Sequence, residues 1–257
     1  MSPLFLASEL GSAVWVDVYD DWSLAPEMRR SVRLLARAGY ERLRRTRRSL
    51  VITTNSLYMQ HMLRPARAHL VPNGVDPRLG SYARGSDETR RLIMMGNFFP
   101  GRTDHELLTQ LALSPAAEEV VIFGCSEEVS TRLQPLISGR PVRLLGKRPL
   151  TEIARIVGSK TVLAVPHVVS DYTVSQDLMK VYQALALGTR VLLPYELFPA
   201  GLGPDQALAL GPGVKVDDVL DGAFARGGLN PAEVDAFIAN NSWGRRAQQV
   251  RELLDES

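Results

Sequence analysis

The sequence predicts an α/β protein built around a mostly parallel β-sheet. The main observation is a regular alternation between residues 91 and 193, where short apolar runs are separated by amphipathic segments of about ten residues. Strands and helices that alternate in this way form βαβ units, whose sheets are covered on both faces. The composition agrees, because 45% hydrophobic and 23% charged residues are usual for a globular protein.

The first 76 residues are predicted to contain three strands and two helices. The run AVWVDVY (13–19) is predicted to be a buried strand that leads into the loop Asp20-Asp21-Trp22-Ser23. Pro26 suits the first turn of a helix, which we expect to continue to about Arg47. The other elements are a strand at 50–53, a helix at 55–63 capped by Asn55 or Ser56, a strand at 69–71 and a sharp turn at Pro72-Asn73-Gly74.

The alternation that follows predicts one sheet with a helix after most of its strands. The expected strands are 92–96, 120–124, 142–145, 161–165 and 191–193, and the expected helices are 104–113, 127–136, 150–157 and 175–187. Two helices close the chain, at 230–239 and 242–254.

The helix predicted between residues 27 and 48 is strongly basic. It carries nine arginines between Arg29 and Arg48 against two acidic residues, Glu27 and Glu41. Leu34, Leu35, Ala38 and Leu43 offer an apolar side for packing. The candidate anionic-surface residues are Arg29, Arg30, Arg33, Arg37, Arg44, Arg45 and Arg48. Three interpretations are open: a solvated helix face, a contact with an anionic membrane surface, and a contact with nucleic acid phosphates.

A second informative stretch runs from Ser170 to Pro194. It is predicted to form a loop, a helix that ends at Gly188, and a short apolar strand. The free N–H groups at the start of such a helix attract anions, and Lys180 would add a full positive charge about one turn further on. A phosphate would therefore bind well there, although an ordinary capped helix with a solvated Lys180 has the same pattern.

Four segments resemble the GT-B glycosyltransferases of the group 1, or GT4-like, family. KVYQALALGTRVLLP (180–194) is similar to their nucleotide-sugar-binding signature, and PNGVD (72–76) is similar to the end of their first domain. VDVYDDWS (16–23) and SWGRRAQQVRELL (242–254) resemble an N-terminal loop and a terminal helix of the same family.

This resemblance implies a GT-B-like fold from which most of the N-terminal acceptor domain is missing. We expect a reduced N-terminal α/β portion at 1–76 and a linker at 77–90, followed by a complete Rossmann-like nucleotide-sugar-binding domain at 91–240. The last segment, 241–257, is expected to pack back on the N-terminal portion.

The resemblance also implies roles for individual residues. Arg102 and Lys180 would hold the donor diphosphate and stabilise the charge that leaves with the nucleotide, and any base would come from Asp20, Asp21 or an added partner. Gln183 stands where the family has an acidic residue for the ribose. His167 ends a predicted strand, where it could enter the cleft or have a structural role. The full expected donor set is Gly96, Asn97, Gly146, Lys147, Leu150, His167, Tyr172, Thr173, Val174, Ser175, Tyr182 and Gln183.

The expected function is transfer of a sugar from a nucleotide-sugar donor, with retention at the anomeric carbon, without a metal or other cofactor. The acceptor could be a saccharide, a lipid-linked molecule or nucleic acid, and a second copy or another chain could complete the cleft. Two alternatives stay open: a donor-binding or regulatory subunit without activity, and a glycosyltransferase for modified DNA bases that uses the arginine-rich helix.

The location is expected to be cytoplasmic, with a peripheral membrane contact as an option. No apolar run reaches the ~18 residues that a membrane span needs, and the first ten residues have no basic region of a signal peptide. The single cysteine, Cys125, excludes an internal disulfide and a cysteine-rich zinc site.

Overall fold

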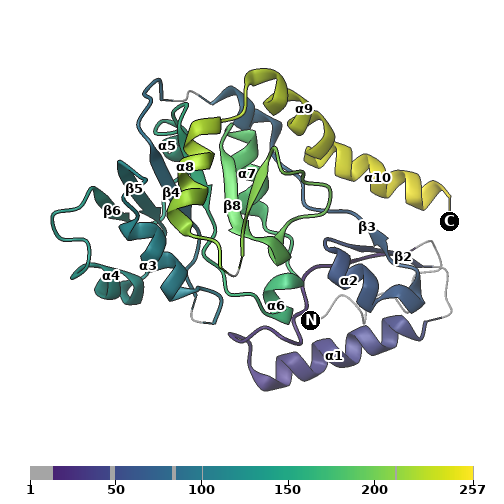
Figure 1. Ribbon diagram of the computed structural model, residues 1–257. Coiled ribbons are helices and arrows are strands. Elements are labelled where there is room, and N and C mark those ends of the chain that lie inside the picture. Colours follow the sequence, from purple (N-terminus) through teal and green to yellow (C-terminus); the bar gives the residue numbers. More distant parts are fainter. Residues whose placement is uncertain (1–13, 47–49, 83–84, 100, 212, 257) are drawn as a thin grey trace.

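Two parallel β-sheets organise the chain (Figure 1). The computed structural model describes residues 14–46, 50–82, 85–99, 101–211 and 213–256. The small sheet has the order β1-β2-β3 and the large sheet the order β6-β5-β4-β7-β8-β9. The strands are β1 Val14–Val18, β2 Leu50–Thr54, β3 His69–Leu70, β4 Arg91–Met95, β5 Glu119–Phe123, β6 Val142–Leu145, β7 Thr161–Ala164, β8 Arg190–Pro194 and β9 Ala207–Leu210.

Helices connect these strands and close the chain. They are α1 Arg30–Arg44, α2 Leu57–Met62, α3 His105–Leu113, α4 Glu127–Leu133, α5 Leu150–Ala154, α6 Asp171–Val174, α7 Met179–Ala186, α8 Val216–Arg226, α9 Pro231–Asn241 and α10 Trp243–Asp255, with the 3-10 turns η2 Arg64–Ala66, η3 Pro77–Ser81 and η4 Tyr195–Leu197. The predicted α/β class with a parallel sheet is confirmed.

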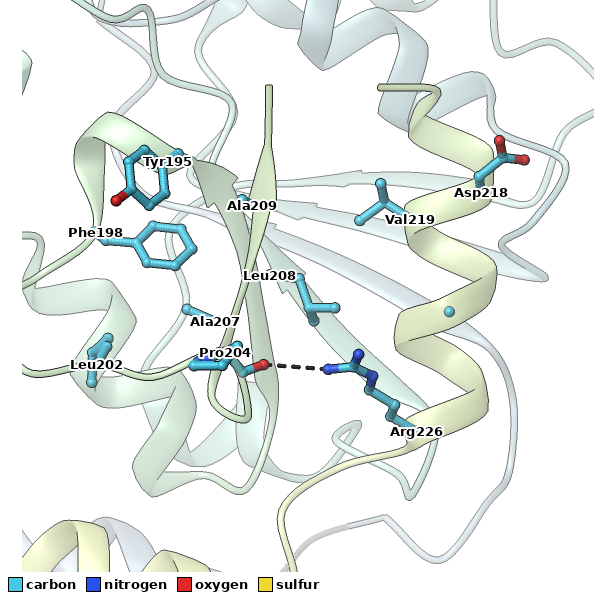
Figure 2. A pocket seen from close by; sticks show the side chains of 11 residues that line it. Tyr195, Phe198, Leu202, Pro204, Ala207, Leu208, Ala209, Asp218, Val219 and Arg226 are labelled. Carbon is cyan, nitrogen blue, oxygen red and sulfur yellow. Dashed lines mark hydrogen bonds between the residues drawn. The ribbon is translucent and has the colours of Figure 1, made fainter. Parts of the chain in front are cut away.

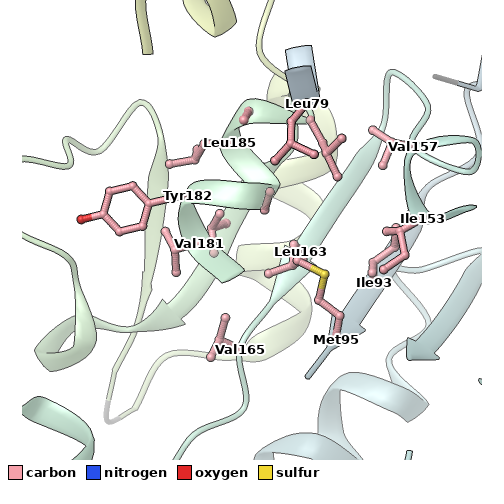
Figure 3. Close-up of a cluster of buried hydrophobic side chains, with 14 of the residues drawn as sticks. Leu79, Ile93, Met95, Ile153, Val157, Leu163, Val165, Val181, Tyr182 and Leu185 are labelled. Carbon is pink, nitrogen blue, oxygen red and sulfur yellow. The ribbon is translucent and has the colours of Figure 1, made fainter. Parts of the chain in front are cut away.

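The large sheet is covered on both faces. On one face, alternate strand residues such as Ile93 and Leu163 pack against Val181 and Leu185 of α7 (Figure 3). On the other face, the intervening residues form a second buried cluster with α3, α4 and α8. Since side chains of a strand alternate between faces, two helical layers explain why these strands are almost wholly apolar.

The small sheet has one fully packed face. Val16, Val18 and Ile52 point to this face and are buried against Tyr40 and Leu43 of α1. The opposite face carries Trp15 and Asp17 of β1 and Tyr19 just after it, and the two aromatic residues are about half exposed. That face is lined in part by α10.

The chain after β3 is joined to the α9–α10 corner. Val75 N–H donates to the Asn241 carbonyl at 2.8 Å, and Trp243 N–H donates to the Val75 carbonyl at 3.1 Å. A Cβ on Gly74 would lie 2.7 Å from the Trp243 ring, so glycine is required for this close approach. The C-terminal helix is thereby fixed next to the small sheet.

The arginine-rich helix differs from its prediction. It begins at Arg30 and not near Pro26, because residues 25–28 form a turn in which Met28 N–H donates to the Ala25 carbonyl at 3.2 Å. The predicted packing of Leu34, Leu35 and Ala38 is wrong, since all three are exposed and only Leu43 of that group is buried. Arg48 lies outside the described residues.

One further helix was predicted incorrectly, and two elements were not predicted. The single helix expected at 175–187 is divided, because α6 ends at Val174 and α7 begins at Met179. The extended conformation of Leu178, with φ −79° and ψ 96°, separates them. Strand β9 and helix α8 were not predicted, since the surrounding segment is rich in glycine and proline, which weaken a periodic signal.

Candidate functional site

A recess of about 290 Å³ opens at the carboxyl ends of β4, β5 and β6. Its wall is completed by α5 and by two residues of α7, Lys180 and Gln183. Six of the residues predicted for a donor line this recess: Gly96, Asn97, Lys147, Leu150, Lys180 and Gln183. Ligands of parallel sheets bind at this edge, next to the point where the strand order reverses, which is here between β4 and β7.

Two glycines keep the floor of the recess open. Gly96 has φ +135°, and a Cβ there would lie 2.6 Å from the Lys180 ammonium nitrogen. Gly124 has φ +79°, and a Cβ there would lie 2.2 Å from the Gly96 carbonyl oxygen. Any other residue at either position would strain the backbone and displace its neighbour.

Lys180 lies beside a buried histidine and not beside a carboxylate. Its Nζ is 3.1 Å from Nε2 of His167, which is 6% exposed. Loss of water, followed by the positive charges of Lys180 and Arg102, holds the pKa of His167 well below its usual value. The imidazole is therefore neutral, its Nε2 accepts from the ammonium group, and its Nδ1 is left buried without a protein partner.

The charge of Lys180 is itself destabilised. Loss of water, and next the positive charge of Arg102, lowers the pKa of Lys180 to about 8. A lysine in this condition gains from an arriving anion, because the anion compensates the charge that the protein leaves unpaired.

Arg102 belongs to the same group of cations and comes from the loop after β4. This loop is held to the chain after β7, since Val168 N–H donates to the Arg102 carbonyl at 2.9 Å. The guanidinium carbon lies 5.0 Å from the Phe99 ring centre and 5.2 Å from that of Tyr172. One guanidinium nitrogen donates to Glu27, whereas Nε is buried without a partner. Arg102 thus has a donor available for a further acceptor.

Glu27 was not predicted, and it connects the N-terminal portion to this loop. Besides its ion pair with Arg102, it accepts a hydrogen bond from the Tyr172 hydroxyl at 3.2 Å. Burial raises the pKa of Glu27, but its hydrogen bonds and the charge of Arg102 outweigh this effect and lower the pKa. The carboxylate therefore stays ionised on Arg102.

The segment between α6 and α7 is bonded to the N-terminal portion. The amide of Asp21 donates to Ser175 Oγ at 2.8 Å, and Ser56 Oγ donates to the Ser175 carbonyl at 2.6 Å. Asp177, a second residue that the sequence reasoning missed, accepts from the Asn73 amide at 2.6 Å and from the Tyr182 hydroxyl at 3.0 Å. These bonds explain why the helix is interrupted at residues 176–178.

The two predicted base candidates differ in their burial and in their hydrogen-bond partners. Asp21 is 5% exposed, and its Oδ1 accepts from both the amide and the hydroxyl of Ser23. Asp20 has a left-handed backbone with φ 38°; its Oδ1 accepts from Asn55 Nδ2 at 3.1 Å and its Oδ2 from Gln176 Nε2 at 3.0 Å. The Asp20 carboxylate bonds to Gln176, in the segment between α6 and α7, whereas Asp21 contacts that segment through its backbone amide.

The other predicted residues lie around the recess or beneath it. Gly146 is exposed, and its carbonyl accepts from the Gly124 amide at 3.2 Å. Tyr172 and Thr173 are buried in α6, and Val174 is half-buried. Tyr182, predicted as a donor contact, is 1% exposed in this structure, with its ring against Phe237 and its hydroxyl on Asp177. Ser175 is likewise fully buried and bonded to protein groups.

Another recess, of about 540 Å³, lies at the opposite edge of the large sheet. Tyr195, Phe198, Leu208 and Val219 line it, and Arg226 is turned to the Pro204 carbonyl at 3.3 Å (Figure 2). Its lining is mainly apolar and brings no group of cations together. Among the described residues, no cluster of three or more histidine, cysteine or acidic side chains could hold a metal ion, and no helix is long and apolar enough to cross a membrane.

Comparison with known proteins gives structural relatives only. No family model and no curated protein matches the sequence. The structure is similar to sucrose-phosphate synthase from Thermosynechococcus elongatus, with a TM-score of 0.70 and 15% identity, over 99% of this chain and 70% of that one. It is also similar to Anabaena HepE in complex with UDP-glucose, with a TM-score of 0.64 and 16% identity, over 95% of this chain and 72% of that one.

A third similar structure is Staphylococcus aureus TarM in a complex that contains UDP. Its TM-score is 0.63 and its identity 9%, over 94% of this chain and 50% of that one. The chain therefore has a GT-B-like fold, the nucleotide-sugar glycosyltransferase fold that its motifs resemble.

Proposed function

We propose that this chain is a glycosyltransferase that binds a nucleotide-sugar at the recess beside Lys180. The observation that carries the proposal is the group formed by Lys180, His167 and Arg102, which has buried unpaired donors and of which Lys180 lines the recess at the carboxyl edge of the parallel sheet. The fold supports the proposal, because HepE, which shares it, forms complexes with UDP and UDP-glucose.

In this proposal the diphosphate lies between Lys180 and Arg102. The phosphate oxygens would pair with the Lys180 ammonium group, whose charge is poorly solvated, and with the Arg102 guanidinium, which can bind two oxygens at once. Negative charge grows on the diphosphate as the bond to the sugar breaks. Cations already in position would therefore stabilise the transition state more than the ground state.

The nucleoside would occupy the remainder of the recess. Leu150 offers an apolar contact for a base, and Gln183 offers an amide for the ribose hydroxyls. Lys147 is exposed at the rim and adds a further positive charge. A neutral amide at position 183 would bind hydroxyls less strongly than a carboxylate does.

The chemistry proposed for the transferred sugar is retention without a metal ion. Lys180 and Arg102 would supply the positive charge that a metal supplies in other transferases. Asp20 is proposed as the carboxylate that meets an acceptor hydroxyl, because its Oδ2 reaches Gln176 of the segment before α7; the hydroxyl would take the place of the Asn55 or Gln176 amide that now donates to it. These features favour an active transferase over a subunit that only binds the donor, and purified protein that hydrolyses or transfers no nucleotide-sugar would reverse that preference.

Calorimetric titration with uridine, guanosine and adenosine diphosphates tests the donor site. We expect one of them to bind with a dissociation constant below about 1 mM, and Lys180→Ala to weaken that binding by about 100-fold. Lys160→Ala is the matched control, because Lys160 is a partly exposed lysine away from the recess, with Glu88 at 3.8 Å. The proposal is wrong if no diphosphate binds, or if the two lysine variants behave alike.

A second proposal concerns the outer side of α1, which we infer to bind an anionic lipid surface. Leu34, Leu35 and Val32 are 57%, 52% and 41% exposed, and Arg30 and Arg37 flank them. An exposed apolar stripe beside arginines is typical of helices that lie in a membrane interface. Binding to nucleic acid would use the arginines and gain nothing from the leucines, so the lipid surface is favoured over the DNA alternative.

Vesicle sedimentation separates these two partners. We expect binding to vesicles that contain about one third anionic lipid, loss of binding for Leu34→Ser/Leu35→Ser, and no comparable effect of Leu57→Ser, which is also 57% exposed but lies on α2. Equal binding to duplex DNA by the wild type and the double variant, without vesicle binding, would favour the nucleic acid partner instead.

A further inference from the structure

A second recess carries side chains that the proposed donor site does not use. It encloses about 330 Å³ between the outer face of the small sheet, residues 71–73 and α10. Trp15, Tyr19 and Trp243 line it, and they remain 47%, 45% and 41% exposed. Small-ligand pockets begin at about this volume, and they combine apolar walls with a few polar groups.

The polar groups of this recess are held in a fixed arrangement. Asp17 and Thr53 are paired in the β1–β2 register. Trp15 Nε1 donates to Thr53 Oγ1 at 2.9 Å, and Thr53 Oγ1 donates to Asp17 Oδ1 at 2.6 Å. The indole N–H is therefore already satisfied, and the exposed surface of Trp15 is mostly ring carbon.

The third aromatic ring is fixed from behind. Trp243 packs so closely on Gly74 that a Cβ there would lie 2.7 Å from its ring. One side of this ring is thus covered by backbone, which leaves the other for the recess. Rigid aromatic rings supply contact area at a low cost in conformational entropy.

The charges of the recess indicate what kind of molecule fits. Arg246 is 8% exposed, and its three nitrogens donate to the Asn73 carbonyl, to Gln249 and to Asn241. It therefore has little capacity left to bind an anion. The carboxylate of Asp17 accepts hydrogen bonds from hydroxyl groups and repels phosphates and acids.

We propose that this recess is a binding site for one neutral sugar unit. The aromatic rings would pack on the apolar face of the sugar, and Asp17 would accept from its hydroxyls. Binding of the sugar stands by itself. Only its further assignment, as an anchor for a distal part of a saccharide acceptor, rests on the proposed function.

Ligand-observed NMR and tryptophan fluorescence with glucose, galactose, N-acetylglucosamine and their β-linked and α-linked disaccharides test the site. We expect at least one to bind in the millimolar range or tighter, and Asp17→Asn and Tyr19→Ala to weaken it by about tenfold or more. Tyr195→Ala is the control, because Tyr195 is a 68% exposed tyrosine in a different recess. Circular dichroism establishes that each variant is folded, and Asp17→Asn keeps the shape of the site if Tyr19→Ala does not fold.

Three outcomes would overturn the site: no sugar binds at about 50 mM, both variants bind as the wild type does, or the protein forms a dimer in which Trp15 becomes buried. The donor proposal is judged separately, by diphosphate binding and its loss in Lys180→Ala. Sugar binding that persists in Lys180→Ala would support the recess, whatever the outcome for the nucleotide.

Discussion

The two sheets differ in how much of their surface the chain itself covers. The large sheet has a buried cluster on each face, and nearly all residues of its four central strands, β5, β4, β7 and β8, are buried. The small sheet has one buried cluster of eight residues, and its other face leaves Trp15 and Tyr19 about half exposed. The comparison shows that the candidate donor site stands on a self-sufficient scaffold, whereas the N-terminal portion depends on bonds to Ser175, Asp177 and α10.

The largest expected effect concerns the N-terminal portion in isolation. We expect residues 1–76 alone to show no cooperative unfolding transition by circular dichroism, because they lose the bonds to Ser175 and Asp177 and the cover of α10. A fragment of residues 86–240 is the comparison, and we expect it to unfold cooperatively since both of its sheet faces are packed. Cooperative unfolding of the short fragment would contradict the dependence described above.

Removing the Asp177 carboxylate should be the strongest single disturbance of the contact between the portions. Asp177→Ala leaves the Asn73 amide and the Tyr182 hydroxyl buried without an acceptor. We expect a loss of about 3 kcal/mol in the free energy of unfolding, measured by urea denaturation at pH 5. Asp218→Ala, in the first turn of α8, serves as control and should change stability by less than about 1 kcal/mol. Similar losses in both variants would show that Asp177 has no special role.

On the side of the large sheet, Gly96 should be the most sensitive position for nucleotide binding. Gly96→Ala adds a Cβ against the Lys180 ammonium group in a backbone conformation that suits glycine. We expect diphosphate affinity to fall by about 100-fold, measured by calorimetry, with the fold preserved. Gly222→Ala, where a Cβ meets no atom, should bind like the wild type. Unchanged affinity in Gly96→Ala would remove Lys180 from the site.

Asp177 should also impose a pH dependence on stability. Burial raises the pKa of its carboxyl from 3.8 to about 6, against the effect of the bonds from Asn73 and Tyr182 and of the Arg246 charge. The folded protein thus binds this proton more tightly than the unfolded chain does. The stability that this proton supplies is greatest below about pH 4, and it is lost as the pH rises through about 6.

This loss amounts to about 2 to 3 kcal/mol and is absent in Asp177→Asn, which carries no charge at any pH. Urea denaturation of both proteins at pH 4, 5, 6 and 7 provides the measurement. The free energy of unfolding of the wild type minus that of the variant should decrease over this range. A difference that stays constant or increases would show that the pKa is not raised.

The smallest expected effect comes from Glu27, which joins the two portions at the donor loop. Glu27→Gln removes the charge that now pairs with Arg102, so the guanidinium can pair with phosphate at a lower cost. We expect diphosphate binding to become about three- to fivefold tighter, measured by calorimetry. Glu41→Gln, whose partner Arg44 lies on the same helix at 2.7 Å, should change nothing. Weaker binding in Glu27→Gln would mean that Glu27 orients Arg102 for the ligand.

The alternation of apolar runs and amphipathic segments in the sequence predicted most strands of the large sheet, because each strand and helix can be recognised from its own residues. Gly96, Lys180 and Gln183, which the resemblance assigns to one donor site, line the same recess. It did not reveal Glu27 or Asp177, whose partners lie 75 and 104 residues away along the chain. The same long-range bonds interrupt the helix between Val174 and Met179. A prediction from neighbouring residues alone does not include these bonds.

The arginine-rich helix illustrates a different limit. Its leucines have helical spacing, but spacing alone does not tell which of two apolar sides packs against the sheet. The structure uses Tyr40 and Leu43 for packing and leaves Leu34 and Leu35 in solvent. Tyr182 is the opposite case. It lies inside the segment that resembles a donor-binding signature, but its side chain is buried in the core.

The bonds made by Ser175 and Asp177 have a consequence for motion. Both residues belong to the short connection that leads directly into α7, the helix that carries Lys180. Separating the two sheets would pull on this connection and so shift the ammonium group. Opening of the molecule and release of a bound anion would thus be a single mechanical event, and an anion held by Lys180 would resist that opening.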